Sequence, residues 1–285
     1  MASDMASDMA SEMTFEKVPE MLRVNSALVP PVQVKNLTLA YGERVVQRDI
    51  TFDIHAGDIF VVMGGSGCGK STLLRSMMGL LTPTQGSVRY YGVDYCTASE
   101  EEQQRMRQQW GVLFQGSALF SAMTLAENVA LPLQQYTTLN EATIRDVVAY
   151  KLALVGLAGF EDYYPEALSG GMRKRAGLAR ALALDPAILF FDEPSAGLDP
   201  VSARRLDELI LHIRDTLGST IVIVTHELAS IFAIADRCGF LDAETRTMLD
   251  QGSPHYLRDS SVHESVRTFL NHGVSSELDC MKEPQ

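Results

Sequence analysis

The sequence predicts an α/β protein built around a phosphate-binding loop, and three observations support this fold class. An apolar run at 59–63 leads into a glycine-rich loop at 64–72, and an apolar helical segment follows it. A second apolar run, 187–191, ends in two adjacent carboxylates. Residues 116–168 show helical patterns and no convincing strand, which indicates a helical insertion. Short apolar runs bounded by turn residues are typical of buried strands, and strand, loop and helix in this order are what a phosphate-binding loop needs.

The loop has a glycine, four residues, and then Gly-Lys-Ser, which is the phosphate-binding pattern. Its glycines allow a tight turn, and its N–H groups and the helix N-terminus attract anionic phosphate together. We expect Lys70 to reach the β- and γ-phosphates and Ser71 to bind Mg²⁺. A glycine-rich turn with a chance lysine is the alternative. The expected nucleotide-binding residues of the loop are Gly64, Gly65, Ser66, Gly67, Cys68, Gly69, Lys70, Ser71 and Thr72.

Composition sets the limits of the other expectations. The chain has 285 residues, 46% of them hydrophobic, and a formal net charge of −12, so it can bury a core and does not resemble a basic nucleic-acid binder. No segment approaches the ~18 consecutive apolar residues of a membrane helix, and the N-terminus lacks the pattern of a signal peptide. Its four cysteines show no metal spacing, and we expect reduced thiols in a cytosolic protein.

The N-terminal third predicts a strand pair behind a low-complexity start. Residues 1–13 repeat Met-Ala-Ser-Asp, and we expect 1–30 to be a disordered lead-in. Residues 32–41 alternate apolar and polar side chains, as a half-buried strand does, and 45–54 reads as its partner. We place Tyr41 on a loop, where its ring could stack on a purine. The alternative is a tyrosine packed at the end of a strand.

Polar residues next to predicted elements are the next candidates. Residues 99–109 predict an exposed helix, and Gln115 ends the strand that follows; a lone glutamine there is usually only a loop residue. Ser169, Gly170 and Gly171 precede a helix rich in Arg, Ala and Leu. They offer a second anion-binding helix start, or else a flexible hinge.

The carboxylates that end the second apolar run are Asp192 and Glu193. Strand periodicity points neighbouring side chains to opposite faces, so the two can act separately. Asp192 can hold Mg²⁺ through its water shell, and Glu193 can polarise an attacking water. His226 follows another apolar strand, 220–225, and is placed to contact a γ-phosphate, although an isolated histidine is more often structural.

The C-terminal part predicts the closing elements of the sheet. A turn-rich loop at 195–200 precedes an amphipathic helix at 201–217. Segments 239–242 and 245–249 are expected to complete the sheet, and 254–272 to form a short terminal helix. The tail, 274–285, is expected to be flexible.

Together these residues resemble the nucleotide-binding subunit of ABC transporters over about 32–272. The decisive motif is Leu168-Ser169-Gly170-Gly171-Met172, which precedes the strand that ends in the two carboxylates. The resemblance implies a P-loop NTPase (RecA-like) core with an N-terminal antiparallel β subdomain and a helical ABC-specific subdomain at about 116–183. The ATPase domain would span 31–273.

The resemblance also implies roles for the single residues. Tyr41 would stack on adenine, and Gln115 would contact Mg²⁺ and the membrane partner. The signature Ser169–Gly171 of one chain would bind the ATP held by another, so two copies would join head to tail around two ATP molecules. Hydrolysis removes the γ-phosphate bridge and lets the dimer open. The implied residues are, for hydrolysis, Glu193, His226 and Gln115; for nucleotide outside the loop, Tyr41, Ser169, Gly170, Gly171 and Asp199; and for the metal, Ser71, Gln115 and Asp192.

A narrower resemblance, to the Mla-type ATPases of phospholipid transport, rests on 113–121, 128–133, 151–157, Met172 and 266–271. It implies an integral membrane permease, a STAS-domain protein and an MCE-domain protein as partners, and no nucleic acid. The chain would then lie on the cytoplasmic face of the inner membrane of a Gram-negative envelope. Alternatives are an ABC ATPase of another importer or exporter, a soluble ABC ATPase of ribosomes or DNA, and a small-molecule kinase. The kinase leaves the signature unexplained.

Overall fold

The computed structural model describes residues 29–271. The expectations for a disordered lead-in and a flexible tail fall on 1–28 and 272–285, outside the described residues. The first half of the described chain contains β1 (Val32–Tyr41), β2 (Arg44–Ile54), β3 (Ile59–Gly64), α3 (Lys70–Met77), β4 (Gln85–Tyr90), β5 (Val93–Asp94), α4 (Glu100–Gln108), β6 (Trp110–Leu113), α5 (Leu125–Tyr136) and α6 (Glu141–Leu154).

The second half begins with a short 3₁₀ turn and continues as alternating strands and helices. Its elements are η1 (Pro165–Ala167), α7 (Gly170–Ala181), β7 (Ile188–Asp192), α8 (Pro200–Leu217), β8 (Thr220–Val224), α9 (Leu228–Ile234), β9 (Arg237–Leu241), β10 (Met248–Gly252) and α10 (Pro254–Ser260). A further helix covers 264–271. In the part of the chain that the structure describes, no helix has the length and apolar composition to cross a membrane.

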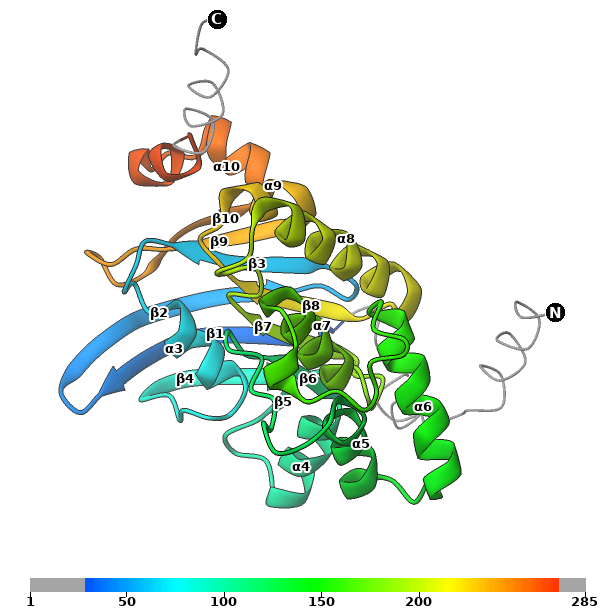
Figure 1. Ribbon diagram of the computed structural model, residues 1–285. Helices are drawn as coiled ribbons and strands as arrows, with labels where there is room; N and C mark the ends of the chain where they lie inside the picture. Colours follow the sequence, from blue (N-terminus) through cyan, green and yellow to red (C-terminus); the bar gives the residue numbers. More distant parts are fainter. Residues whose placement is uncertain (1–28, 272–285) are drawn as a thin grey trace, which may run out of the picture.

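Two sheets carry the fold. The central sheet has the order β10-β9-β3-β8-β7-β6, with every neighbouring pair parallel except β10 and β9. The smaller sheet, β2-β1-β4-β5, is antiparallel. Figure 1 shows this smaller sheet, in blue and cyan, on one side, and α5 and α6, in green, away from it. The fold is therefore the mixed α/β arrangement that the sequence predicts.

The two faces of the central sheet belong to different hydrophobic clusters. Ile59, Val61 and Met63 of β3 face a cluster shared with α5 to α9, whereas Phe60 and Val62 face the antiparallel sheet and α3. Phe60 stacks on a phenylalanine of β2 with 4.9 Å between ring centroids. A strand covered on both faces is apolar throughout, and this explains why β3 was readable from sequence.

Parallel strands also bring their carboxyl ends to one edge of the sheet. The ends of β3, β7 and β8 are neighbours, because β8 pairs with both β3 and β7. Ligands of open α/β sheets bind in the crevice outside this edge. The phosphate-binding loop, the two carboxylates and His226 follow these three strands, so the topology gathers them.

Three local expectations were wrong. Tyr41 ends β1 rather than lying on a loop. The last strand begins at Met248, because Thr245 is held in a turn by its backbone N–H and hydroxyl, which both donate to the carboxylate of Asp242. The single terminal helix is two helices, since Ser261 ends α10 and its hydroxyl accepts the backbone N–H of His263. The two-residue strand β5 gave no signal in the sequence.

Candidate nucleotide site

The glycine-rich loop joins β3 to α3 and is packed from two sides. A Cβ on Gly64 would lie 2.3 Å from the carbonyl oxygen of Leu241, at the end of β9. A Cβ on Gly69 would lie 2.7 Å from Cγ1 of Val46, on β2. Both glycines have positive φ, 147° and 97°, which side chains rarely tolerate. The close approach of β9 and β2 therefore requires glycine at these two positions.

Lys70 is the first residue of α3 and folds back over the loop. Its side chain is buried, and Nζ donates to the carbonyl oxygens of Gly64 and Gly65, at 2.9 Å each. The first turn of α3 contains no acidic residue, and Gly69 supplies no side-chain cap. The free N–H groups of this turn and the ammonium thus form a positive cradle suited to phosphate.

A residue that sequence reasoning missed fixes the loop from the antiparallel sheet. The fully buried Gln47 of β2 donates through Nε2 to the carbonyl oxygen of Cys68 and, at 3.1 Å, to that of Asp242. Burial raises the pKa of the Cys68 thiol, and the ammonium of Lys70 opposes this. Gln47 thereby joins the phosphate-binding loop to the turn after β9.

Tyr41 is held close to this contact by the β1–β2 hairpin. It pairs with Arg44, two residues before the valine that packs on Gly69. The ring is 49% exposed. The hairpin therefore offers an accessible aromatic face beside the phosphate-binding loop, and base stacking stays a prediction for this residue.

Ser71 and Asp192 form the first of two polar clusters at the strand ends. The hydroxyl of Ser71 donates to Oδ1 of Asp192 at 3.1 Å. Burial raises the pKa of Asp192, the carboxylate of Glu193 adds to the effect, and the Ser71 hydroxyl opposes it. Hydroxyl and carboxylate oxygens are ligands that Mg²⁺ prefers, and a cation would offset the cost of this half-buried charge. The pair therefore fits a magnesium ion.

Glu193 belongs to the second cluster and turns away from Asp192. Its Oε1 lies 2.8 Å from Nδ1 of His226, and its Oε2 accepts the hydroxyl of Thr225 at 3.2 Å. The carboxylate accepts, so Nδ1 carries the proton. Glu193 has φ 49°, in the left-handed region. The adjacent carboxylates thus have separate partners, but Glu193 lies beyond β7, so strand periodicity does not account for its direction.

The signature residues lie at the exposed N-terminus of α7. Ser169 caps the helix by accepting the N–H of Met172 at 3.3 Å, and no acidic residue lies in the first turn. Asp199 caps α8 by accepting two N–H groups at 3.0 Å. A Cβ on Gly171 would lie 3.9 Å from Ser202 of α8, so the two helix starts are neighbours.

The structure does not connect all predicted site residues. Among the described residues, Tyr41, Gln115 and Ser169 make no side-chain hydrogen bond to the phosphate-binding loop or to the two carboxylates. Gln115 is exposed in the loop after β6. One chain therefore gathers the loop, Asp192, Glu193 and His226, and leaves the remaining candidates, Tyr41, Gln115, Ser169–Gly171 and Asp199, without a hydrogen bond to them.

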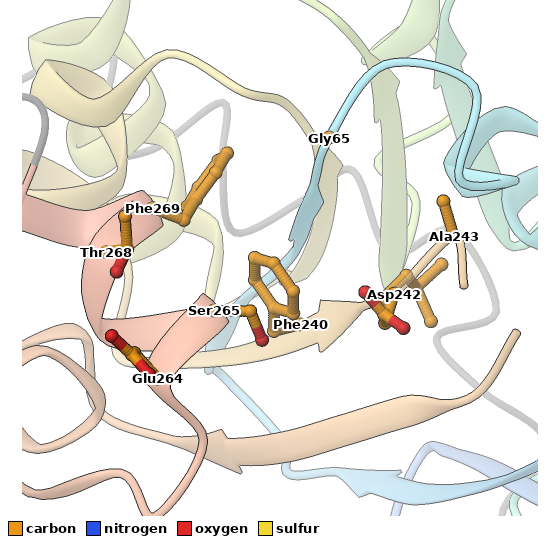
Figure 2. A pocket seen from close by; sticks show the side chains of 9 residues that line it. Gly65, Phe240, Asp242, Ala243, Glu264, Ser265, Thr268 and Phe269 are labelled. Atoms are coloured by element: carbon orange, nitrogen blue, oxygen red, sulfur yellow. The ribbon is translucent and has the colours of Figure 1, made fainter. Parts of the chain in front are cut away.

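An open groove of about 530 Å³ touches the other side of the loop at Gly65 (Figure 2). It runs between the end of β9 and the helix 264–271, and Phe240 and Phe269 meet there edge to face at 5.3 Å. The charged side chains of the groove, Asp242 and Glu264, are both carboxylates. Because these repel phosphate, the cradle of Lys70 suits a nucleotide better than this groove does.

Comparisons with known proteins agree with the geometry. The sequence model described as "ABC transporter" matches residues 47–196. A probable ribonucleotide transport ATP-binding protein, Mkl, of Mycobacterium leprae is 44% identical over 254 residues, which are 87% of this chain and 72% of the relative. The intermembrane phospholipid transport system ATP-binding protein MlaF of Haemophilus influenzae is 38% identical over 231 residues, 81% of this chain and 87% of the relative.

Two solved structures have similar folds. One is the dimeric post-hydrolysis state of the ATP-binding cassette MJ0796 bound to ADP and Pi, with 29% identity and a TM-score of 0.71 over 78% of this chain and 98% of the other. The second is cbiO1 from Clostridium perfringens, part of the transporter complex cbiONQ, with 26% identity and a TM-score of 0.75 over 90% of this chain and all of the other.

Proposed function

This chain belongs to the ABC transporter family as a nucleotide-binding, ATP-hydrolysing subunit, and from that premise we propose that it energises phospholipid transport between the inner and outer membranes of a Gram-negative envelope. The observation that supports the proposed mode of action is the position of the signature. It is exposed at the start of α7 and is separate from the phosphate-binding loop of the same chain. A site that needs both parts needs two chains.

The two-chain site follows from helix-terminus chemistry. The N–H groups of Gly170 and Gly171 have no acceptor among the described residues, at a helix start without acidic residues, and such a start attracts a phosphate. A head-to-tail partner would present it to the ATP on Lys70. The dimeric cassette bound to ADP and Pi supports this assembly. Bound ATP would then hold the two chains together, and hydrolysis would release them.

Within each chain the residues divide the work of hydrolysis. Glu193 would accept a proton from the attacking water. His226 would orient the Glu193 carboxylate through its 2.8 Å contact to Oε1. Ser71 and Asp192 would hold Mg²⁺, which neutralises charge on the phosphates. Gln115 lies on the exposed loop after β6. There it would contact both Mg²⁺ and the membrane partner, and so couple nucleotide binding to that partner. Tyr41 would bind the adenine by stacking.

The proposal that phospholipid is the cargo rests on the segments that resemble Mla-type proteins. One of them includes Asn128, which has a defined structural role. The fully buried Asn128 accepts the N–H of Phe120 at 2.8 Å and donates to three carbonyl oxygens, the last of Thr124 at 2.9 Å. It thereby sets the shape of the loop that follows Gln115 and exposes Phe120, which is 52% accessible. We propose this loop as the docking surface for an integral membrane permease.

The same reasoning extends to the other proposed partners and to location. STAS-domain and MCE-domain proteins would complete the transporter, and the chain would lie at the cytoplasmic face of the inner membrane. The 38% identity to the phospholipid transport protein of Haemophilus influenzae supports this proposal.

Ribonucleotide transport is a second candidate, because the relative with 44% identity has that name. The two candidates differ in cargo and not in the ATP chemistry, so residues of the nucleotide site cannot separate them.

The test is a mild-detergent pull-down of the tagged chain from its own membranes, with mass spectrometry of proteins and lipids. We expect a permease, an MCE-domain protein and bound phospholipid. An untagged chain serves as the control. A permease with other companions and no lipid would reject the lipid proposal, and ribosomal or DNA-bound partners without a permease would reject transport altogether.

A further inference from the structure

A buried lysine of α7 contacts the backbone of Glu193, whose carboxylate contacts His226. Lys174 is 6% exposed, and its Nζ donates to the backbone carbonyl oxygen of Glu193 at 3.1 Å. A lysine is seldom buried so fully unless its ammonium has a specific partner. Burial lowers its pKa, and the nearby carboxylate of Glu193 opposes this. The phosphate chemistry described above makes no use of this ammonium.

The backbone at Glu193 needs such a partner. Its φ of 49° is uncommon for a residue with a side chain, and such conformations persist only where surrounding contacts fix them. The N–H of Glu193 donates to the carbonyl oxygen of Val224 at 2.9 Å, and the carboxylate contacts Thr225 and His226. These anchors come from β8 and the residues after it. The anchor from the helical side is Lys174.

Lys174 also lies one helical turn after the signature. It is four residues beyond Gly170, on the same face of α7. Further along the helix, Gly177 packs so closely that a Cβ would lie 2.9 Å from Leu113 of β6 and 3.1 Å from Ser117. The helix is therefore closely packed in its second half, and a shift of its start would reach the ammonium and the carbonyl bound to it.

We propose that Lys174 is a positioning residue that holds the backbone of Glu193 and links it to the signature end of α7. The inference rests on the two-chain site of the proposed function. There, the signature of one chain contacts the nucleotide of its partner, while Glu193 acts on the nucleotide of its own chain. Lys174 then couples occupancy of one site to the hydrolytic geometry of the other.

The test compares Lys174→Met, which keeps an unbranched apolar stem and removes the ammonium, with Lys174→Arg, which keeps a donor. ATP affinity, steady-state ATPase kinetics and thermal unfolding are measured on the full-length chain with Mg-ATP. We expect the methionine variant to lose about tenfold to a hundredfold in kcat, because small misplacements of a catalytic group have effects of this size. KM and ATP affinity stay within about twofold, the Hill coefficient for ATP falls towards one, and arginine restores kcat.

The matched control is Arg105→Met on α4, which likewise replaces a cationic side chain with methionine, at a position that is 63% exposed, and is expected to leave kcat unchanged. If the methionine variant does not fold, Lys174→Gln replaces it, since the amide is one atom shorter and the same loss of kcat is expected. An unchanged kcat overturns the proposal. So does a parallel loss of kcat, affinity and unfolding temperature that arginine does not restore.

The outcomes also separate this inference from the proposed function. None of the readouts depends on lipid. If Ser169→Arg keeps full turnover, the two-chain site fails and the coupling between sites fails with it. A loss of kcat in Lys174→Met would then still show that Lys174 positions Glu193.

Discussion

Replacing Asp207 by asparagine is expected to stabilise the protein at neutral pH, by an amount that disappears in acid. Asp207 lies on α8 and is 6% exposed. Its Oδ2 accepts the hydroxyl of Ser230, on α9, at 2.8 Å, and among the described residues nothing donates to Oδ1. Burial raises its pKa to about 6, the carboxylates of Glu227 and Glu208 add to this, and the Ser230 hydroxyl opposes it.

The magnitude follows from linkage between protonation and folding. An unfolded aspartate titrates near pH ~3.9, so between about pH 4 and pH 6 the folded chain binds one more proton than the unfolded chain. The free energy of unfolding then falls by about 1.4 kcal/mol per pH unit, or about 3 kcal/mol in total. The contribution is complete below pH 4 and is lost as the pH rises through 6. Asparagine keeps the acceptor for Ser230 and does not ionise.

The assay is urea unfolding of both proteins, followed by circular dichroism at several pH values from 4.5 to 7.5. The stability gained by Asp207→Asn should grow steadily up to pH 6 and level off above it. Asp146→Asn is the matched control, because it makes the same change at an exposed position of α6, and its effect should vary little with pH. A gain that does not depend on pH, or one that is larger in acid, would refute the reasoning.

Three further predictions concern the nucleotide. Lys70→Ala should weaken ATP binding by about tenfold to a hundredfold, because a charged hydrogen bond contributes about 1.5–3 kcal/mol; titration with a fluorescent nucleotide that shows unchanged affinity would contradict the assignment of the loop. Glu193→Gln should lower kcat by about 10²–10⁴ and trap an ATP-bound dimer; light scattering that shows only monomer with ATP would count against it. Ser169→Arg should leave ATP binding within about threefold and block turnover, because the larger cation occupies the helix start; normal phosphate release would exclude a two-chain site.

The phosphate-binding loop and the two strand-end carboxylates could be predicted because their signal is local. Strand β3, which leads into the phosphate-binding loop, and strand β7, which ends at Asp192, are buried on both faces, so both could be recognised as apolar runs in the sequence. Parallel strands place their carboxyl ends at one edge of the sheet. The contact between Glu193 and His226, in contrast, became evident only in the structure.

Residues that fix this geometry could not be predicted, since their burial depends on distant segments. Gln47 lies in a strand where a polar side chain reads as solvent-facing, yet the phosphate-binding loop and the turn after β9 cover it completely. Lys174 stands among arginines, where a lysine reads as surface charge. It is buried because the backbone of Glu193 turns its carbonyl towards α7. Neither contact leaves a periodic pattern in the sequence.

The arrangement of these contacts indicates where ATP must act. Within one chain, Lys70, Ser71 and Asp192 are already joined to the loop or to one another at hydrogen-bond distance, and Glu193 is fixed on three sides. Like the first turn of α3, the helix start at Ser169 keeps N–H groups, those of Gly170 and Gly171, that have no acceptor among the described residues. Because free helix N–H groups and the phosphate that satisfies them attract each other, nucleotide has more to gain from joining two chains than from rearranging one. If the proposed two-chain site is correct, Glu193 is already positioned within each chain, and ATP drives the closure of the pair.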